Sequence, residues 1–583
     1  MARALLQGTP LSPGIAIGAM LRVPDARNFE KRSITEEEVH AELTALQRAS
    51  REACADLERA IQAMPDNLAE YREIISAQLE LARDSRILNG AAARIRHKRV
   101  CAAWALSDTI DELSALFSDM ADPYLSDRAQ DIRAIGKCLL DALTGFSESI
   151  KKDDPGILAA WELSPADVME YRLEGIKGLI MVEGGATSHT AILARGLKVP
   201  AVAGVSGLFR LARHDEIIIL DGIAGCVVLG PDEADLGHYT EIKEKYNAFE
   251  REAAQCASSA AVTINGRHIP VLANLESQQE LGEYAKCGAE GIGLYRTEYA
   301  YLRGGLPTEE ALFREYSAII AAADRRRVVF RTLDVGADKI LPIQEALNEP
   351  NPALGLRGIR FCLKHRDILI TQLRAILTAG VNANVAIMVP MITNLAELAE
   401  IKAILAQISG ELTEAGIAHA KNPPLGVMVE TPAAVMISDE LARECDFLSL
   451  GTNDLFHYLM AIDRNNRHVA YLYDPLHPGF LRALLQVAKA AHARHKQVSV
   501  CGELATSPMG LAILLGLGID SFSANPRFVP AMKHLLRQLD MDACKQIADA
   551  AINGATHDRI KRMLRQALAG GDELGLIDPI YHR

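Results

Sequence analysis

The sequence is poor in charge and in aromatic rings, and it has no long apolar run. Of its 583 residues only 23% are charged and 5% aromatic, and the formal net charge is −13. This balance argues against nucleic acid or an anionic membrane as the main partner, because both attract basic surfaces. No apolar run approaches the roughly 20 residues that span a bilayer, and no apolar leader opens the chain. We therefore expect a soluble, cytoplasmic protein.

Paired cysteines and zinc-like spacings are also missing. The ten cysteines are scattered and form no CxxC motif, which favours reduced thiols over a disulfide framework. No His and Cys cluster has the spacing of a zinc site. The hydrophobic fraction, in contrast, is 49%, and the length is enough for three or four domains.

The first half of the chain changes its periodicity twice. Residues 1–25 contain a turn and a strand-like segment, a helical pattern begins at Thr35, and strand signals return after Asp154. Because the first strand needs a sheet, we predict an α/β domain formed by residues 1–25 and 144–230, with an inserted bundle of about four helices at 26–143. The polar, Glu/Lys-rich segment at 231–260 predicts a linker helix, which is either a spacer or a hinge.

A histidine in this α/β domain lies where a loop becomes a helix. The apolar run 178–182 is typical of a buried strand, Gly184 and Gly185 break it, and helical composition follows His189. Free backbone N–H groups at a helix start can hold a phosphate, and a neutral imidazole is nucleophilic near pH 7. A histidine beside glycines is more often a loop or capping residue. By itself, the local pattern therefore makes His189 no more than a candidate phosphoryl carrier.

Residues 261–583 alternate short apolar runs with helical stretches. Eight runs can be marked, which predicts a (β/α)₈ TIM barrel: Ile269–Ala273, Gly291–Tyr295, Val328–Phe330, Ala386–Val389, Leu425–Val429, Phe447–Leu450, Val498–Val500 and Ile519–Phe522. Polar residues follow these runs, at the strand ends where barrel enzymes place their chemistry: Asn274, Arg296, Arg331, Glu430, Asn453, Asp454, Cys501 and Ser523. One Arg or Glu at a strand end is more often in a surface ion pair. The repetition at successive strand ends predicts that these side chains share one mouth.

The residue types at this mouth suit a substrate that carries both phosphate and carboxylate. The guanidinium fork binds either group bidentately, and the candidates are Arg296, Arg331, Arg357 and Arg464. Glu430 and Asp454 are hard oxygen donors of the kind that hold Mg²⁺ together with substrate oxygens. The alternative is that these carboxylates are simply paired with the arginines.

Several motifs resemble one known family. Gly-Gly-Ala-Thr-Ser-His-Thr-Ala-Ile-Leu-Ala-Arg (184–195) resembles the phosphohistidine signature shared by Enzyme I of the bacterial phosphoenolpyruvate:sugar phosphotransferase system, phosphoenolpyruvate synthase and pyruvate phosphate dikinase. Further segments are similar, in the same order, to the barrel motifs of the Enzyme I family: 291–298, 331–339, 351–360, 427–434, 451–455 and 501–505. The resemblance extends over nearly the whole chain.

The resemblance implies a mechanism and a site. His189 would take the phosphoryl group of phosphoenolpyruvate, releasing pyruvate, and pass it to an HPr-like phosphocarrier protein docked on the inserted helices. Cys501 would protonate the departing enolate. Glu430 and Asp454 would hold Mg²⁺. The residues implied to bind the substrate are Arg296, Arg331, Asn453 and Arg464, with Arg357 as a further contact. Family members dimerise through the barrel, which implies a homodimer.

His189 has to reach the barrel and then an acceptor, so we predict that its domain swivels about a hinge near residues 230–260. Four places depart from the sugar-transport members of the family: Gln78, Glu80, Ala186 and Phe456-His457. The acceptor therefore stays open, and a regulatory paralogue that serves a dedicated carrier remains an alternative. A synthase or dikinase would need an ATP-binding domain, for which the chain has neither a Gly-rich segment nor the spare length.

Overall fold

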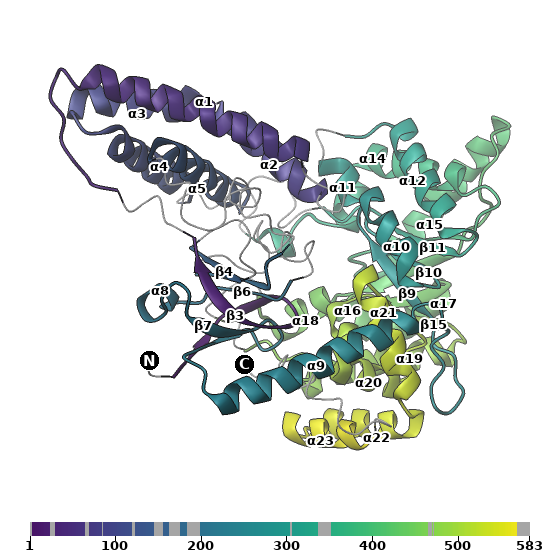
Figure 1. Ribbon diagram of the computed structural model, residues 1–583. Helices are drawn as coiled ribbons and strands as arrows, with labels where there is room; N and C mark the ends of the chain where they lie inside the picture. The colour runs from purple at the N-terminus through teal and green to yellow at the C-terminus, as the bar shows by residue number, and fades with distance from the viewer. Residues whose placement is uncertain are drawn as a thin grey trace. The chain divides into compact units, whose positions relative to one another are not determined.

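The computed structural model describes residues 3–23, 29–63, 69–83, 85–118, 123–144, 156–161, 175–182, 199–302, 306–335, 351–463, 469 and 472–567. The chain divides into two compact units, whose main segments are Met1–Tyr246 and Asn247–Asp578. The first unit contains a β-sheet and a helical bundle, and the second contains a barrel (Figure 1). None of the described helices is both long enough and apolar enough to cross a membrane.

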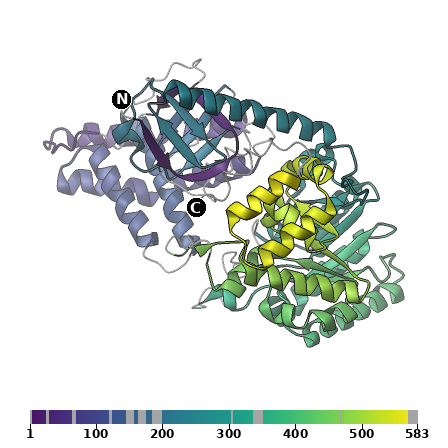
Figure 2. The ribbon, with the colours of Figure 1, turned by 90° about the horizontal axis from the view of Figure 1, so that it is seen from below.

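The sheet of the first unit joins the two ends of that unit's sequence. Its strands are β1 (Ala4–Gln7), β2 (Thr9–Ser12), β3 (Ile15–Arg22), β4 (Ile157–Ala160), β5 (Gly178–Met181), β6 (Ala201–Ala203), β7 (Ile217–Asp221) and β8 (Cys226–Leu229), in the order β1-β8-β7-β3-β4-β5-β6-β2. β3 pairs in parallel with β4 and antiparallel with β7, so that purple N-terminal strands lie beside teal ones (Figure 2). A short helix, α8 (Leu208–Leu211), precedes β7.

The helical bundle is inserted between β3 and β4, two strands that are neighbours in the sheet. Its helices are α1 (Val39–Ala63), α2 (Ala69–Ala82), α3 (Ser85–Lys98), α4 (Ala102–Ser118) and α5 (Pro123–Thr144). They share one core, in which Leu57, Ala91 and Leu139 are fully buried. The sequence predicts about four helices here, and the described residues form five.

Helix α9 (Glu233–Cys256) begins in the first unit and ends in the second. Near its start, Asp235 receives two 2.8 Å hydrogen bonds from the guanidinium of Arg3. Near its end, the ring of Phe249 packs edge-on against His534, with ring centroids 5.3 Å apart. The linker helix predicted at residues 231–260 is thus a single helix that is anchored at both ends.

The second unit is a closed barrel of eight parallel strands. They are β9 (Val271–Leu275), β10 (Gly291–Tyr295), β11 (Arg327–Arg331), β12 (Val385–Val389), β13 (Leu425–Val429), β14 (Phe447–Leu450), β15 (Gln497–Val500) and β16 (Ser521–Ala524). Each strand pairs with its neighbours in parallel, and β16 closes the barrel against β9. The α/β fold with an inserted helical bundle and a C-terminal TIM barrel is therefore confirmed.

Helices surround the barrel, and local sequence explains where several of them begin. They are α10 (Leu281–Cys287), α11 (Glu298–Leu302), α12 (Glu309–Ala323), α13 (Ile359–Lys364), α14 (Arg366–Ala379), α15 (Leu395–Glu414), α16 (Pro432–Met436), α17 (Ser438–Glu444), α18 (Thr452–Met460), α19 (Pro478–Ala493), α20 (Pro508–Gly516), α21 (Val529–Gln538), α22 (Met541–Ile552) and α23 (His557–Ala567). Asn394 and Glu397 form a capping box at the start of α15, and Thr431 caps α16.

Candidate functional site

The predicted site residues lie at one end of the barrel, where the strands end. Arg331 is the last residue of β11, Glu430 is the first residue after β13, and Cys501 is the first after β15. Asp454 lies in the first turn of α18, which follows β14. Because all eight strands are parallel, these positions fall at the carboxyl ends of the strands, where barrel enzymes hold their substrates.

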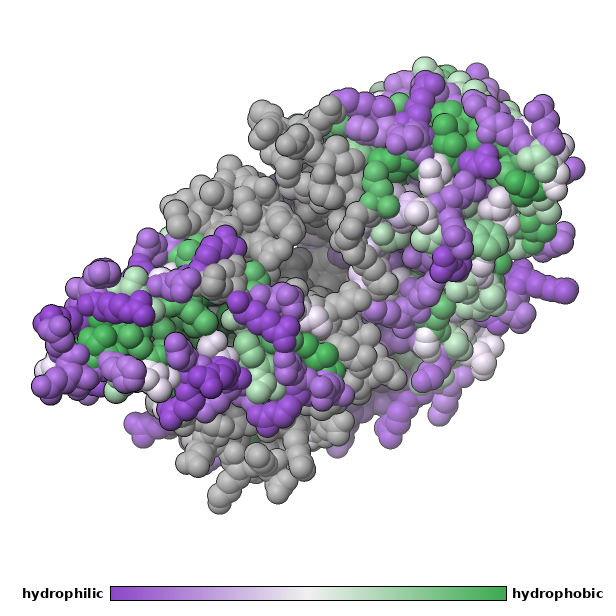
Figure 3. Space-filling model, turned by 90° about the horizontal axis from the view of Figure 1, so that it is seen from above, coloured by the Kyte–Doolittle hydropathy of each residue, from purple (hydrophilic) through white to green (hydrophobic). Residues whose placement is uncertain are grey.

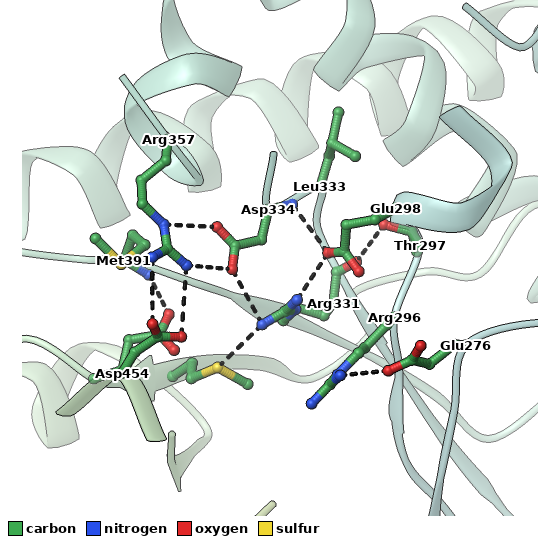
Figure 4. A network of polar contacts seen from close by, with 12 residues as sticks. Glu276, Arg296, Thr297, Glu298, Arg331, Leu333, Asp334, Arg357, Met391 and Asp454 are labelled. Atoms are coloured by element: carbon green, nitrogen blue, oxygen red, sulfur yellow. Dashed lines mark hydrogen bonds and ion pairs between the residues drawn. The ribbon is translucent and has the colours of Figure 1, made fainter. Parts of the chain in front are cut away.

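Five of the side chains at this mouth form a row of alternating charge (Figure 4). Asp454 Oδ1 lies 3.3 Å from Arg357 Nη1, and Arg357 Nη2 lies 2.9 Å from Asp334 Oδ2. Asp334 Oδ2 is in turn 3.3 Å from Arg331 Nη1, and Arg331 Nη2 is 2.8 Å from Glu298 Oε1. Burial of such charges is tolerated because every one has an opposite neighbour.

The row holds its arginines charged and in fixed positions. Burial by itself would lower the pKa of the Arg357 guanidinium, but the Asp334 and Asp454 carboxylates outweigh it and raise that pKa. The same balance, with Glu298 and Asp334 as the opposing anions, raises the pKa of Arg331. Both guanidiniums are therefore permanent cations at the mouth of the barrel.

Two guanidinium nitrogens at the mouth have no hydrogen-bond partner in the part of the chain that the structure describes. Nε of Arg331 and Nε of Arg296 are buried, and neither has a hydrogen-bond partner among the described residues. Arg296 directly follows β10, and its Nη1 is paired with Glu276 (Figure 4). An unpaired buried N–H is costly, so these two N–H groups are suited to donating hydrogen bonds to an anionic ligand.

Glu430 is a buried carboxylate, and none of the described arginines forms an ion pair with it. It is 1% exposed, and its Oε1 accepts a 2.8 Å hydrogen bond from the backbone N–H of Met391. Met391 has a positive φ of 59°, a conformation that non-glycine residues adopt at some energetic expense. Burial, together with the nearby Asp454 and Asp334, raises the pKa of Glu430.

Glycine is required beside this carboxylate. A Cβ on Gly451 would lie 2.6 Å from Oε2 of Glu430 and 2.9 Å from its Cβ. The residue between β14 and α18 therefore leaves room for Glu430, before Asn453 and Asp454 follow in α18. The side-chain Oδ1 of Asn453 accepts from the backbone N–H of Glu503, at 3.4 Å, which connects α18 to the segment after β15.

Cys501 presents a buried thiol at the same end of the barrel. It is 6% exposed, and its Sγ accepts from Ser449 Oγ at 3.7 Å and donates to the carbonyl of Leu450 at 3.7 Å. Burial raises the pKa of the Cys501 thiol, while the Ser449 hydroxyl lowers it. The group is therefore a protonated thiol near neutral pH, which is the form that a proton donor requires.

Of the nine predicted site residues, the structure brings Arg296, Arg331, Arg357, Glu430, Asn453, Asp454 and Cys501 to one end of the barrel. His189 and Arg464 lie outside the described residues. Glu298 and Asp334 have no predicted role, although both lie inside the motifs at 291–298 and 331–339. A signal was present, because each carboxylate follows a strand-end arginine by two or three residues.

The charges at the mouth also bear on a metal ion. Among the described residues of the mouth, three arginines (Arg296, Arg331 and Arg357) face five carboxylates (Glu276, Glu298, Asp334, Glu430 and Asp454), a formal excess of two negative charges within that set. Asp454 is paired with Arg357, as the alternative interpretation expected, whereas Glu430 is not. Among the described residues no group of three or more His, Cys, Asp or Glu is arranged to hold a metal. Two carboxylates with substrate oxygens are nevertheless a common Mg²⁺ site, and the donors here fit it.

The fold and this mouth define a class, the phosphoenolpyruvate-utilising enzymes. Three family models match successive parts of the chain: the N-terminal domain of these enzymes at residues 7–128, their mobile domain at 152–225, and their PEP-binding domain at 250–541. The last of these matches covers the barrel and all of the site residues described above.

The chain belongs, within this class, to the phosphoenolpyruvate-protein phosphotransferase family. It is 37% identical over 570 residues to the phosphoenolpyruvate-protein phosphotransferase of Bacillus sp. (strain S), covering 97% of this chain and 98% of that protein. The Haemophilus influenzae protein of the same name is 35% identical over 572 residues, covering 97% and 99%. A solution structure titled as Enzyme I is 29% identical, with a TM-score of 0.34, and covers 42% of this chain and 99% of its own.

Proposed function

We propose that this protein transfers the phosphoryl group of phosphoenolpyruvate to His189, releases pyruvate, and then passes the group to a histidine of an HPr-like phosphocarrier protein. One observation carries the proposal: arginines gather at the carboxyl ends of the barrel strands, and two of their buried nitrogens have no partner among the described residues. Positioning and charge neutralisation are the main sources of catalysis in phosphoryl transfer.

The substrate-binding set consists of Arg296, Arg331, Asn453 and Arg464, with Arg357 as a further contact. Support for Arg331 and Arg357 comes from their ion pairs to Asp334, which fix both guanidiniums before the substrate arrives. A preorganised cation stabilises developing charge without reorganisation during the reaction. In this assignment Arg331 and Arg296 offer their Nε atoms to the phosphate and carboxylate of the substrate.

Glu430 and Asp454 are the proposed ligands of Mg²⁺. When bound there, Mg²⁺ supplies positive charge that neutralises the phosphate oxygens of the substrate. The protein's own contribution is to keep both carboxylates in place: the N–H of Met391 holds Glu430, and Arg357 holds Asp454. Cys501, a buried and protonated thiol, is the proposed donor of a proton to the methylene carbon of the enolate.

The domain assignment follows the same proposal. Residues 1–25 and 144–230 form the phosphohistidine domain, 26–143 the carrier-binding domain, 231–260 the linker and 261–583 the phosphoenolpyruvate-binding barrel. The match of residues 152–225 to the mobile domain of the family supports a swivelling His189. We further propose a cytoplasmic homodimer, with the barrel as the dimerising part.

The helical bundle is the proposed docking site of the carrier. Its face in Figure 3 has a hydrophobic strip between hydrophilic side chains, the composition typical of a protein interface. Of the two departures on α2, Glu80 is exposed and Gln78 is buried. Glu80 is therefore the one that can contact a carrier and contribute to the choice of acceptor.

The deciding experiment uses phosphoenolpyruvate labelled in its phosphoryl group, with Mg²⁺, on the full-length protein. We expect acid-labile label on the wild type and none on His189→Ala. A panel of HPr-like carriers then identifies the acceptor, with Glu80→Ala as a matched variant on the docking face. Equal labelling of the wild type and His189→Ala would contradict the proposed role of His189.

A further inference from the structure

One side of the barrel interior is lined by hydroxyl groups. The apolar cluster inside the barrel joins Leu294, Val329, Ala386, Met388, Met428 and Phe447 to Cys501. Since Cys501 belongs to this cluster, its side chain points into the barrel, and so does that of Ser449, which contacts it. TIM barrels usually fill this interior with branched apolar residues. The serines on β14 and β15 are therefore an exception that packing does not explain.

These hydroxyls form a connected chain that ends at the thiol. Ser449 and Ser499 are register partners on β14 and β15. Ser499 Oγ donates to Ser449 Oγ at 3.0 Å, and Ser449 Oγ donates to Cys501 Sγ at 3.7 Å. Both of these bonds run toward the sulfur, and the other acceptor near the Ser499 hydroxyl, the carbonyl of Leu448, is farther away, at 3.5 Å. This is the arrangement in which a proton can move to a thiolate by successive short transfers.

The two ends of the chain differ in exposure. Ser449 is 1% exposed and Cys501 is 6% exposed, whereas Ser499 is partly exposed. Its neighbour in register on β16, Ser521, is also partly exposed. Of the three groups, Ser499 is therefore the one most open to solvent.

We infer that Ser499 and Ser449 form a relay that returns a proton to Cys501 after each turnover. The inference rests on the proposed function, in which the S–H bond of Cys501 breaks and a C–H bond forms at the methylene carbon of the enolate. The resulting thiolate takes the proton of Ser449, Ser449 takes that of Ser499, and a solvent proton replaces the last one. The net change is the transfer of one solvent proton to the methyl group of pyruvate, without any redox step.

Deuterium exchange into the methyl group of pyruvate tests the relay. Pyruvate, Mg²⁺ and the full-length protein in D₂O are followed by NMR, which needs neither a carrier nor His189. A relay carries deuterium to the sulfur, so we expect Ser449→Ala and Ser499→Ala to slow the exchange about tenfold or more, as loss of a proton-transfer group does. The first turnover uses the proton already on the thiol. Labelling of His189 by phosphoenolpyruvate in a single turnover is measured beside the exchange, and it should fall much less than the exchange does.

Matched variants separate the relay from simple packing. Ser521→Ala removes a hydroxyl from the adjacent strand and should leave the exchange rate unchanged. Ser449→Cys supplies another donor and should restore part of the exchange that Ser449→Ala loses. Cys501→Ala should abolish the exchange. Exchange at the wild-type rate in Ser449→Ala and Ser499→Ala would overturn the relay. Loss of single-turnover labelling together with exchange would also overturn it, in favour of a structural role. If the wild type takes no label at all, the proposed function itself has failed.

Discussion

Asp334 is the residue on which the arrangement of charges depends most. Its carboxylate contacts both Arg331 and Arg357, and its own backbone N–H donates to Glu298 at 3.1 Å. The sequence placed the arginines at the mouth but gave Asp334 no role. In a sequence, each charged residue has many possible partners of opposite sign. Only the fold brings Arg357 to Asp334.

Removal of the Asp334 carboxylate should destabilise the barrel. Asp334→Ala leaves two buried guanidiniums without their shared anion, and breaking a buried pair in this way costs about 3–5 kcal/mol. Denaturation in urea measures the loss, and the KM for phosphoenolpyruvate should rise because both arginines lose their positions. Asp439→Ala, which removes exposed pairs to Arg443 and Arg494, is the control and should leave both quantities unchanged. An Asp334→Ala protein as stable as the wild type would contradict the prediction.

Gly451 should control the position of Glu430. In Gly451→Ala the new Cβ lies 2.6 Å from Glu430 Oε2, so that side chain has to move away from its hydrogen bond with Met391. We expect the Mg²⁺ concentration for half-maximal activity to rise about tenfold or more, on the scale of losses from displaced ligand-supporting groups. Gly410→Ala is the matched control, because its Cβ meets no atom within 4 Å. Unchanged Mg²⁺ dependence in Gly451→Ala would separate Glu430 from the metal.

At the scale of elements, the end of α9 is fastened to the barrel by a buried lysine. Lys533, on α21, is 2% exposed, and its Nζ donates to the carbonyls of Ala257 at 2.9 Å and Gly288 at 2.6 Å. Gly288 has a φ of +73°, and a Cβ there would lie 1.8 Å from the carbonyl oxygen of Ala257. The chain leaving α9 and the end of α10 can therefore meet only at a glycine.

Lys533→Met should loosen this connection. The substitution keeps the apolar length of the side chain but leaves two buried carbonyls without their charged donor, which costs about 1.5–3 kcal/mol. Unfolding of the barrel unit in urea, followed by hydrogen exchange at residues 249–257, measures the effect. Lys402→Met, at an exposed pair with Glu444, should change neither measurement. Unaltered protection of residues 249–257 in Lys533→Met would show that other contacts hold the end of α9.

At the scale of the whole molecule, the two units should respond differently to the substrate. A ligand that binds only the native barrel stabilises it by about 2.7 kcal/mol at a concentration 100 times its Kd. Calorimetry should therefore show one transition that moves upward with phosphoenolpyruvate and Mg²⁺ and one that does not. His189→Ala should keep this shift, and Arg331→Ala should lose it. A shift that disappears in His189→Ala would place the binding site outside the barrel.

The sequence by itself determined the elements of this protein and their order. A short apolar run is a local feature that the sequence shows directly. The bounds of all eight predicted barrel strands lie within two residues of those of the observed strands, for example Gly291–Tyr295 and Leu425–Val429. It also determined which charged residues follow the strands. Only the tertiary structure decided which charges meet: the row from Asp454 to Glu298, the N–H that Met391 gives to Glu430, and the serines beneath Cys501. These contacts join residues from different strands and loops, and their geometry is set by closure of the barrel, which no local pattern encodes.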